Sequence, residues 1–271
     1  MTDVAKAADL SEVDFGQLSP RQFRELARAG KYRRLTTRNV CLGHVQCAMV
    51  SIPRHLAFDF LVFCQRNQRP CPVLEVLDPG DYLSRRIASG ADLRTDLPLY
   101  SVFRDGKLDG HVEDVLDLWR PDLVTFLIGS NTSCDQALQR AGVQTERHRW
   151  VLRTSIQTDP AGPFSGPLVV TMRWLTPREV VIATQLTGRF PFNHGAPIHI
   201  GDPAAIGADL EHPMTGKEPV PPMPSGVVPV FWACSMTPQA IAQAAGVEFM
   251  ITSGPSLGLI SDLRSDQVCA P

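Results

Sequence analysis

The order of extended and helical segments along the chain constrains its fold more than any other feature. An apolar extended run is followed directly by an amphipathic helical segment over 45–65, 123–141, 167–187 and 228–245. Strands that alternate with helices are typical of α/β proteins, in which the helix usually connects two parallel strands. We therefore predict an α/β fold of two intimately packed domains with a mainly parallel sheet.

Capping patterns predict where the helices begin. The segments 19–22 and 176–179 each hold a hydroxyl residue, a proline and then the glutamine or glutamate that completes a capping box. Thr237 begins a looser copy of this pattern, which Gly246 ends. Helices are predicted after all three starts.

A hairpin and a lobe boundary complete the predicted architecture. Asp105-Gly106 separates two extended runs, as in a type I′ turn, and we assign this β-hairpin at 100–113 to a smaller lobe. Residues 211–225 hold five prolines and are expected to form a long ordered loop. The expected units within 18–262 are an N-terminal α/β lobe at 18–155, which includes the hairpin, and a C-terminal α/β lobe at 156–262, with flexible tails at 1–17 and 263–271.

Composition argues against several classes of protein. Of the 271 residues, 44% are hydrophobic and 20% are charged, as in soluble globular proteins. The net charge of -2 and the scattered basic residues provide no field that would attract nucleic acid. No run approaches about eighteen apolar residues, and the N-terminus lacks an apolar signal region. We therefore expect a cytoplasmic protein without a membrane span.

Cysteine usage points to a reducing environment. The number of cysteines is odd and no Cys-x-x-Cys pair occurs, which argues against a disulfide framework and against a zinc knuckle. Most are expected to be small buried thiols. The seven cysteines are Cys41, Cys47, Cys64, Cys71, Cys134, Cys234 and Cys269.

The stretch 190–203 concentrates ionisable groups in a loop. It contains His194, His199 and Asp202, together with Gly195 and three prolines whose positions no helix tolerates. Convergent ionisable groups on a rigid loop are a common way to build a site, so we assign catalysis to these three side chains, together with Asp96. The three loop side chains are also possible metal ligands, but the His-x4-His spacing is not that of a zinc protease, and we predict no metal. The alternative is a turn with exposed histidines.

A second candidate site lies at 92–96. Asp92, Arg94 and Asp96 would share one face of an extended segment, where they could hold the ammonium and carboxylate groups of one small zwitterion. The alternative is a solvated loop whose local ion pairs contribute little.

Further candidates for anion binding follow along the chain. Arg153 and Thr154, at the end of a predicted strand, could clamp a carboxylate. Ser165 and Gly166 lie in a Gly/Pro bend whose backbone donors could hold an oxyanion. Cys234 precedes a helix N-terminus that would lower the pKa of its thiol, although a buried inert thiol is the alternative. The sequence contains no dinucleotide fingerprint, P-loop or Gly-x-Ser-x-Gly motif.

Several longer blocks are similar to one known family. They occur in the same order over roughly residues 20–262 and resemble the D-glutamate cyclase family. This family is also called the hydro-lyase family or the domain of unknown function 1445. The blocks include Gly43-His-Val-Gln46, Cys71-Pro-Val-Leu-Glu-Val76, Gly90-Ala-Asp-Leu-Arg-Thr-Asp-Leu-Pro98, Phe126-Leu-Ile-Gly129, Pro160-Ala-Gly-Pro-Phe-Ser-Gly-Pro167, His194-Gly-Ala-Pro-Ile-His-Ile-Gly-Asp-Pro203 and Val228-Pro-Val-Phe-Trp-Ala-Cys234.

The resemblance implies two α/β domains and a reaction in which D-glutamate loses water to give 5-oxo-D-proline without an organic cofactor. In such a step the amine is deprotonated, the γ-carboxylate is attacked, and the departing oxygen is protonated while an oxyanion is stabilised. Mapped onto the matching blocks, Arg94 and Arg153 would clamp carboxylates, and Asp96 or Asp92 would hold the ammonium group.

The same mapping gives the proton-transfer groups. His194 and His199 would exchange protons, and Asp202 would orient a histidine. Backbone donors around Gly166 or Gly195 would hold the oxyanion.

The sequence also departs from the family pattern. His44 stands in place of an aromatic residue and Ala48 in place of an amide, while Ser130 replaces a cysteine and Asp135 a longer acid. Further differences are Leu152, Thr158 and the segment Ser253–Gly258. These changes favour an altered substrate or an altered chemistry, as in a member specialised for a biosynthetic pathway.

The sequence therefore indicates a hydro-lyase that eliminates water from, or cyclises, a small carboxylate or amino-acid-like substrate. The alternatives are a small-molecule binding protein that has lost catalysis and a cyclase that does not dehydrate. No organic cofactor is expected, and a homodimer is the working hypothesis for the oligomeric state.

Overall fold

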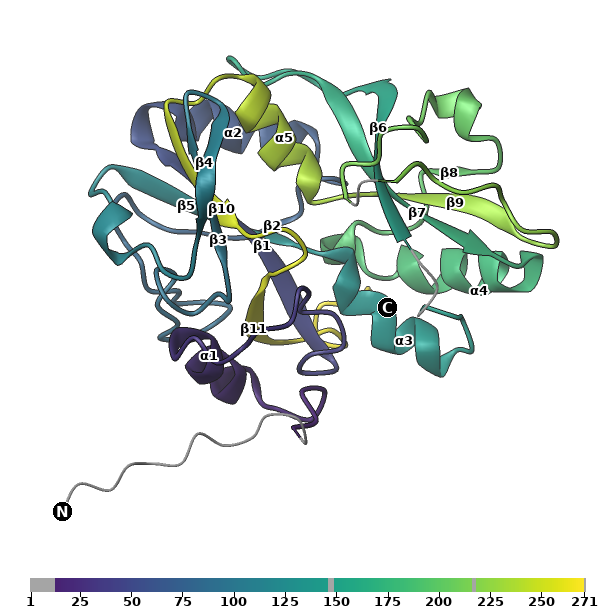
Figure 1. Ribbon diagram of the computed structural model, residues 1–271, viewed down its shortest axis with the longest axis horizontal. Coiled ribbons are helices and arrows are strands. Elements are labelled where there is room, and N and C mark those ends of the chain that lie inside the picture. The colour runs from purple at the N-terminus through teal and green to yellow at the C-terminus, as the bar shows by residue number, and fades with distance from the viewer. Residues whose placement is uncertain (1–12, 146–148, 216–217, 271) are drawn as a thin grey trace.

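The computed structural model describes residues 13–145, 149–215 and 218–270 (Figure 1). The α-helices are α1 (Pro20–Arg28), α2 (Arg54–Arg66), α3 (Asp135–Arg140), α4 (Pro177–Gly188) and α5 (Met236–Ala244). The strands are β1 (His44–Pro53), β2 (Val73–Val76), β3 (Tyr100–Arg104), β4 (Lys107–Val112), β5 (Leu123–Gly129), β6 (Arg149–Gln157), β7 (Pro167–Leu175), β8 (His199–Ile200), β9 (Val228–Ala233), β10 (Phe249–Ser253) and β11 (Leu259–Arg264). Short 3-10 helices are η2 (Leu116–Leu118), η3 (Asn131–Cys134), η4 (Pro191–Asn193) and η5 (Pro203–Ile206).

The strands form two sheets that lie side by side (Figure 1). The larger has the order β2-β5-β1-β10-β3-β4, with β11 also paired to β1, and the smaller has the order β6-β7-β9-β8. Strands β10 and β11 come from the region that the sequence assigned to a C-terminal lobe, yet they pair in the larger sheet. The smaller sheet takes its strands from 149–233 alone.

The α/β class is confirmed, but the expectation of a mainly parallel sheet was wrong. Every pairing between strands in the described ranges is antiparallel. The reason is that the helices connect strands that are not neighbours. β2 follows α2 but pairs with β5 instead of β1, and β10 follows α5 into the other sheet. A strand–helix–strand order gives parallel neighbours only when the helix returns the chain beside the strand it left.

The predicted hairpin forms, in a different setting from the one expected. Asp105 and Gly106 have φ of 48° and 71°, as a type I′ turn requires, and they join β3 to β4. Because β3 also pairs with β10, the hairpin belongs to the larger sheet and not to a smaller lobe.

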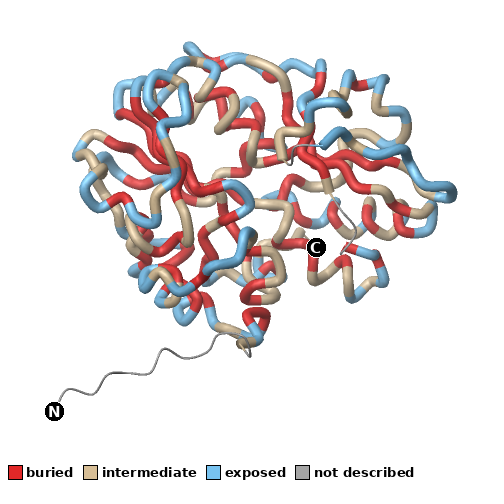
Figure 2. The backbone as a smooth tube through the Cα atoms, in the orientation of Figure 1, coloured by how far each residue is buried: buried red, intermediate tan, exposed pale blue. Residues whose placement is uncertain are grey.

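Helices cover one face of each sheet. Phe60 and Phe63 of α2 and Ile241 of α5 pack with Phe126 against the larger sheet, and α4 covers the smaller sheet (Figure 1) through Ala183. Buried backbone follows the strands of both sheets (Figure 2). Each fully buried large apolar side chain contributes about 1.5–3 kcal/mol to folding, so these layers fix the relative positions of the strand ends.

The two helix starts with a full capping box are confirmed. The Ser19 and Thr176 hydroxyls accept from the backbone N–H groups of Gln22 and Glu179, whose side chains complete the box. The start at Thr237 was misplaced, because α5 begins at Met236 without a side-chain cap. The Thr237 hydroxyl instead donates to the Val169 carbonyl at 3.1 Å.

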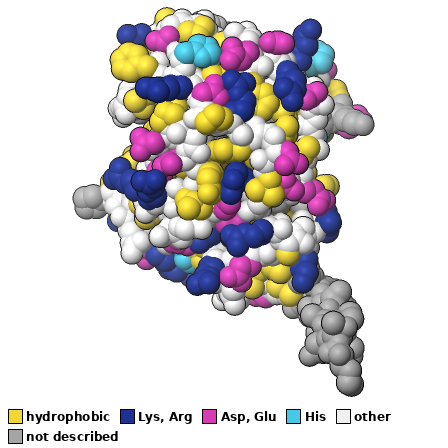
Figure 3. Space-filling view, turned by 90° about the vertical axis from the view of Figure 1, so that its left-hand side faces the viewer, with side chains coloured by type: hydrophobic (Ala, Val, Ile, Leu, Met, Phe, Trp, Pro, Cys, Tyr) yellow, Lys and Arg dark blue, Asp and Glu magenta, His cyan; other side chains and the backbone are white. Residues whose placement is uncertain are grey.

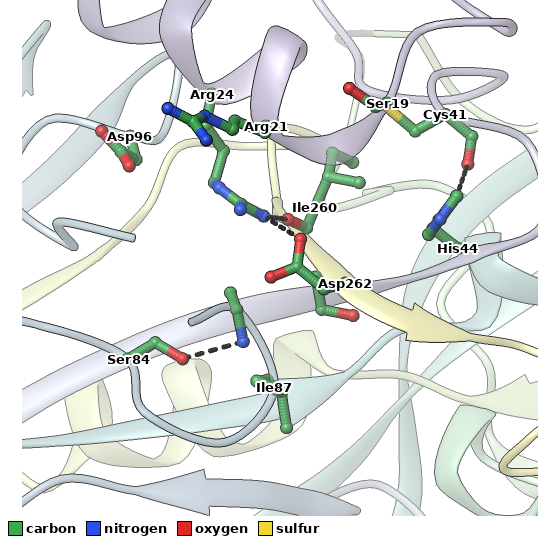
Figure 4. Close-up of polar contacts among 12 residues, drawn as sticks. Ser19, Arg21, Arg24, Cys41, His44, Ser84, Ile87, Asp96, Ile260 and Asp262 are labelled. Carbon is green, nitrogen blue, oxygen red and sulfur yellow. Dashed lines mark hydrogen bonds and ion pairs between the residues drawn. The ribbon is translucent and has the colours of Figure 1, made fainter. Parts of the chain in front are cut away.

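Helix α1 is fixed to β11 by a buried arginine (Figure 4). Nη1 of Arg24 donates to the Ile260 carbonyl and to the Asp262 carboxylate, at 2.9 Å each. A guanidinium is suited to such a position because it has five donors in a rigid plane.

Figure 3 views the molecule from the side on which the larger sheet lies. Basic and acidic side chains are interspersed on this face. Within the described ranges, no helix has the length and apolar character needed to cross a membrane.

Candidate functional site

A cleft lies where the two sheets meet. One wall comes from the larger sheet and consists of residues 46–48 of β1, 130–132 after β5 and the loop 253–258 after β10. The other wall comes from the smaller sheet and its junction with α5, and includes Arg149, Thr171 and Cys234. Ligand sites commonly form at such a junction, because side chains from separate layers converge there.

The wall from the larger sheet is a network of neutral groups built on Gln46, which is 4% exposed. Its Oε1 accepts from the hydroxyls of Thr37 at 3.0 Å and Thr132 at 3.2 Å, and its Nε2 donates to the Thr37 carbonyl at 2.9 Å. Ser130 extends the network through a 3.1 Å contact with the Thr132 hydroxyl. A buried polar network satisfied in this way is rigid, so this wall is preorganised.

The wall from the smaller sheet carries a relay of polar side chains. Asn131 accepts from Arg149 Nη1 at 3.5 Å and donates from Nδ2 to the Thr171 hydroxyl at 3.0 Å. Thr171 in turn faces the Cys234 thiol. A guanidinium, an amide, a hydroxyl and a thiol thus lie one after another along this wall of the cleft.

Positive charge predominates beside this wall. The Asp135 carboxylate is buried between Arg173, at 2.6 Å, and Arg38, at 3.0 Å. Arg149 makes no ion pair with any residue in the described ranges. Burial lowers the pKa of Arg149 to about 10, and the neighbouring Arg173 and Arg38 act in the same direction, while Asp135 opposes them. Two guanidinium groups thus pair with one carboxylate while a third lies nearby, and this excess of positive charge favours an anion in the cleft.

Cys234 has the opposite pKa shift to the one that its position before α5 suggested. Burial raises the pKa of its thiol, and this outweighs the Thr171 hydroxyl, the Met236 backbone N–H and the Arg149 charge, all of which lower it. The thiol is therefore protonated at neutral pH and suits an acid better than a nucleophile. All seven cysteines are free, and six of them are buried.

Among the predicted site residues, only Cys234 lines the cleft; the loop at 190–203 lies behind it. His194 is 1% exposed, and its Nδ1 is 2.7 Å from the Arg69 carbonyl. Since that carbonyl can only accept, Nδ1 carries the proton and the unpartnered Nε2 is an acceptor. Burial lowers the pKa of His194 to about 4, so the ring is neutral.

Other members of the loop lie apart from the cleft. His199 is on the edge strand β8, and its Nε2 is 2.8 Å from the backbone oxygen of Asp202. The Asp202 carboxylate instead accepts from the Ala204 N–H and caps η5. Asp202 thus contacts the histidine through its carbonyl, not through the carboxylate expected to orient it. Gly195 has φ of 71°, a conformation that favours glycine.

The segment 92–96 is a turn, so the expectation of an extended face was wrong. The Asp96 N–H donates to the Asp92 carbonyl at 2.9 Å. Asp92 pairs with Arg94 at 2.8 Å, whereas Asp96, which is fully buried, pairs with Arg28 of α1 at 2.8 Å. Both carboxylates have protein partners: Asp92 pairs within the turn, and Asp96 joins the turn to α1.

The remaining predicted contacts also lie outside the cleft lining. Arg153 is exposed on β6, and the Thr154 hydroxyl donates to the Leu168 carbonyl at 2.8 Å. Ser165 is exposed in the β6–β7 connection, and the Gly166 carbonyl accepts from Thr158. The roles assigned to these residues stay predictions.

Among the residues with a described position, no group of three or more His, Cys, Asp or Glu side chains could hold a metal ion.

Sequence reasoning missed Arg149, Asn131 and Thr171, because no local motif marks them. A usable signal was nevertheless present. Of the positions at which the chain departs from the family pattern, Ala48, Ser130 and Ser253–Gly258 all line the cleft. These differences are scattered in sequence but lie around one cleft in the structure.

Comparison with known proteins identifies the family of the chain. A profile described as D-glutamate cyclase matches residues 124–262. Proteins named "Putative hydro-lyase" are 45% identical in Stutzerimonas stutzeri and 43% in Geobacillus kaustophilus, and the matches cover 94% and 93% of this chain and 97% of each relative. A solved nitrogen repressor-like protein from Methanococcus jannaschii is 7% identical, with a TM-score of 0.38 over 89% of this chain and 94% of that one, which is too distant to support an argument.

Proposed function

The chain belongs to the D-glutamate cyclase family, and from that premise we propose that it is a carbon–oxygen lyase that dehydrates or cyclises a small carboxylate substrate bound in the cleft. The observation that carries the proposal is Arg149, a guanidinium at the cleft that has no carboxylate partner among the described residues. A partly buried guanidinium at a cleft can hold a substrate carboxylate through charge-assisted hydrogen bonds.

The remaining side chains of the cleft suggest how the reaction would proceed. Cyclisation of a D-glutamate-like substrate joins its amine nitrogen to the γ-carboxyl carbon and releases one oxygen as water. In this proposal, Arg149 holds the substrate carboxylate, and neutral donors of the wall around Ser130 stabilise the developing oxyanion. The Cys234 thiol would protonate the departing oxygen, because it lines the cleft and burial keeps it in its protonated form at neutral pH.

A specific observation favours a second candidate function. Of the described residues that line the cleft, none is a carboxylate or an imidazole, and its titratable side chains are Arg149, Cys47 and Cys234. General base catalysis ordinarily uses a carboxylate or an imidazole. The alternative is therefore a protein that binds a small carboxylate in the same cleft without converting it.

The two functions are separated by measuring binding and turnover on one sample. A set of D- and L-amino acids and dicarboxylates, beginning with D-glutamate, is incubated with the protein and followed by proton NMR for a dehydrated or cyclised product. Ligands are ranked in parallel by isothermal titration calorimetry. Turnover of a carboxylate supports the lyase, binding without turnover supports the binding protein, and neither binding nor turnover of any carboxylate contradicts both.

The role of Cys234 has its own test within the same assay. Cys234→Ser keeps a small hydroxyl donor but replaces the thiol with a much weaker acid, so product formation should fall at least tenfold while ligand affinity changes little. Cys64→Ser, which changes another buried cysteine away from the cleft lining, is the matched control. Equal turnover by wild type and Cys234→Ser would remove the thiol from the mechanism.

A further inference from the structure

A small cavity lies behind the cleft and is separated from it by Asn131, whose side chain lines both. Residues of η3, α3, β7, α4, η4 and β9 line it. Asn193 and Arg173, on its wall, are 1% and 5% exposed. Both side chains are therefore largely shielded from bulk solvent.

Three atoms at this cavity have no hydrogen-bond partner in the protein. They are Nη1 of Arg173 and both Nδ2 and Oδ1 of Asn193. Buried polar atoms are paired in the great majority of cases, and leaving one unpaired costs as much as its desolvation. The Asn193 amide also interacts with the Cys134 thiol, so the atoms that call for a ligand in the cavity are Nη1 of Arg173 and one end of that amide.

Trp232, Thr187 and Asn131, the other hydrogen-bonding side chains of the cavity wall, already have protein partners and require no ligand. Nε1 of Trp232 donates to the Thr187 hydroxyl at 3.1 Å, and that hydroxyl donates to the Ala183 carbonyl at 2.7 Å. Asn131 donates to Thr171 on the side of the cleft. The ligand is therefore defined by Arg173 and Asn193.

The unpartnered atoms require a ligand that both donates and accepts. Arg173 Nη1 can only donate, whereas Asn193 Oδ1 can only accept. A halide would satisfy the first atom and leave the second unpaired, and a cation would be repelled by the guanidinium. Water satisfies both, and the cavity has the size of a single water molecule.

The interaction between Asn193 and Cys134 is consistent with the Nδ2 end of the amide lying toward the sulfur. Burial raises the pKa of the Cys134 thiol to about 12, and the Asn193 side chain opposes this shift, as an N–H group directed at the sulfur would. With Nδ2 toward the sulfur, Oδ1 is left for the cavity.

We propose that this cavity binds one water molecule, which accepts a hydrogen bond from Arg173 Nη1 and donates one to Asn193 Oδ1. The second terminal nitrogen of Arg173 is occupied by Asp135 at 2.6 Å, so the water completes the hydrogen bonding at the end of that guanidinium. The site does not depend on the proposed reaction.

A high-resolution crystal structure of the full chain, grown with sodium bromide as the salt, tests the proposal directly. The expected result is one density peak within hydrogen-bond distance of Arg173 Nη1 and Asn193 Oδ1, without anomalous signal at the bromine edge. An anomalous peak there would show an anion site and overturn the proposal. An empty cavity would overturn it as well.

A pair of variants tests the same site in solution. Asn193→Leu occupies similar space without polar atoms, so the water should be lost and the midpoint of thermal unfolding should fall by several degrees. Thr184→Val is the control: it removes another unpartnered buried hydroxyl, on α4, which faces none of this cavity, and its midpoint should stay the same or rise. If Asn193→Leu were as stable as Thr184→Val, no bound water would be needed at Asn193. If it fails to fold, the bromide crystal of the wild type decides.

Discussion

Arg173 of β7 donates a 2.6 Å hydrogen bond to Asp135, the first residue of α3, and so joins the smaller sheet to the segment that follows the larger one. Asp135 is 2% exposed, and its other oxygen accepts from Arg38 at 3.0 Å. One carboxylate therefore holds two guanidinium groups from different parts of the chain at the back of the cleft.

The first prediction concerns this carboxylate. Asp135→Asn keeps the shape but leaves two buried guanidinium groups without a countercharge, so the free energy of unfolding should fall by about 3–5 kcal/mol. The control is Asp122→Asn, which breaks the exposed 2.7 Å pair with Arg120 and should change stability by less than about 1 kcal/mol. Urea denaturation of both variants measures the difference. Equal small decreases in the free energy of unfolding would mean that Asp135 does not stabilise the arginine cluster.

The second prediction concerns pH. Burial holds the pKa of His194 at about 4 in the folded protein, below the value of about 6.5 in an unfolded chain. Between these two values the unfolded state binds the extra proton. Stability from this group is therefore complete above about pH 6.5 and falls as the pH drops toward 4, by about 3 kcal/mol in all.

His194→Asn tests this dependence. Asparagine tolerates the left-handed conformation at φ of 74°, and it can still donate to the Arg69 carbonyl, but it does not titrate. Its stability, measured by thermal unfolding at a series of pH values, should fall less steeply than that of the wild type between pH 6.5 and 4. Parallel curves for the two proteins would place the acid-sensitive group elsewhere.

The third prediction concerns the support that η4 gives to the cleft. A Cβ at Gly129 would lie 1.8 Å from the Phe192 carbonyl oxygen, which is a backbone atom and cannot move aside cheaply. Gly129→Ala should therefore displace η4 from the end of β5 and lower the unfolding midpoint strongly. At Gly110, in β4, a Cβ meets nothing within 4 Å, so Gly110→Ala should be tolerated. Similar midpoints for both variants would contradict the close packing of η4 on β5.

Local chemistry made much of the secondary structure predictable. The capping boxes at Ser19 and Thr176 and the Asp105-Gly106 turn are each decided by neighbours within a few residues, and all three form as expected. Sheet order depends on contacts that are distant in sequence. The return of β10 and β11 to the larger sheet, which makes the helices connect strands that are not neighbours, carries no local signal.

The site was harder to predict for the same reason. The sequence concentrates histidines and prolines at 190–203, but the structure uses that loop to pack His194 and Asn193 behind the cleft. Arg149 and Asn131 lie on separate elements, β6 and η3, and are brought together only by the tertiary fold. Single polar residues in ordinary strands and turns have no motif by which to recognise them, although the departures at Ala48 and Ser130 pointed to the same cleft.

The measurement that tests the central claim most directly compares two arginines of β6. Arg149 lines the cleft, whereas Arg153 is exposed four residues further along the same strand. With any carboxylate that binds the wild type, Arg149→Gln should weaken affinity by about tenfold or more, since a charge-assisted hydrogen bond contributes about 1.5–3 kcal/mol. Arg153→Gln should leave affinity within about twofold. The reverse result, with affinity lost in Arg153→Gln and kept in Arg149→Gln, would move the carboxylate site out of the cleft and contradict the account.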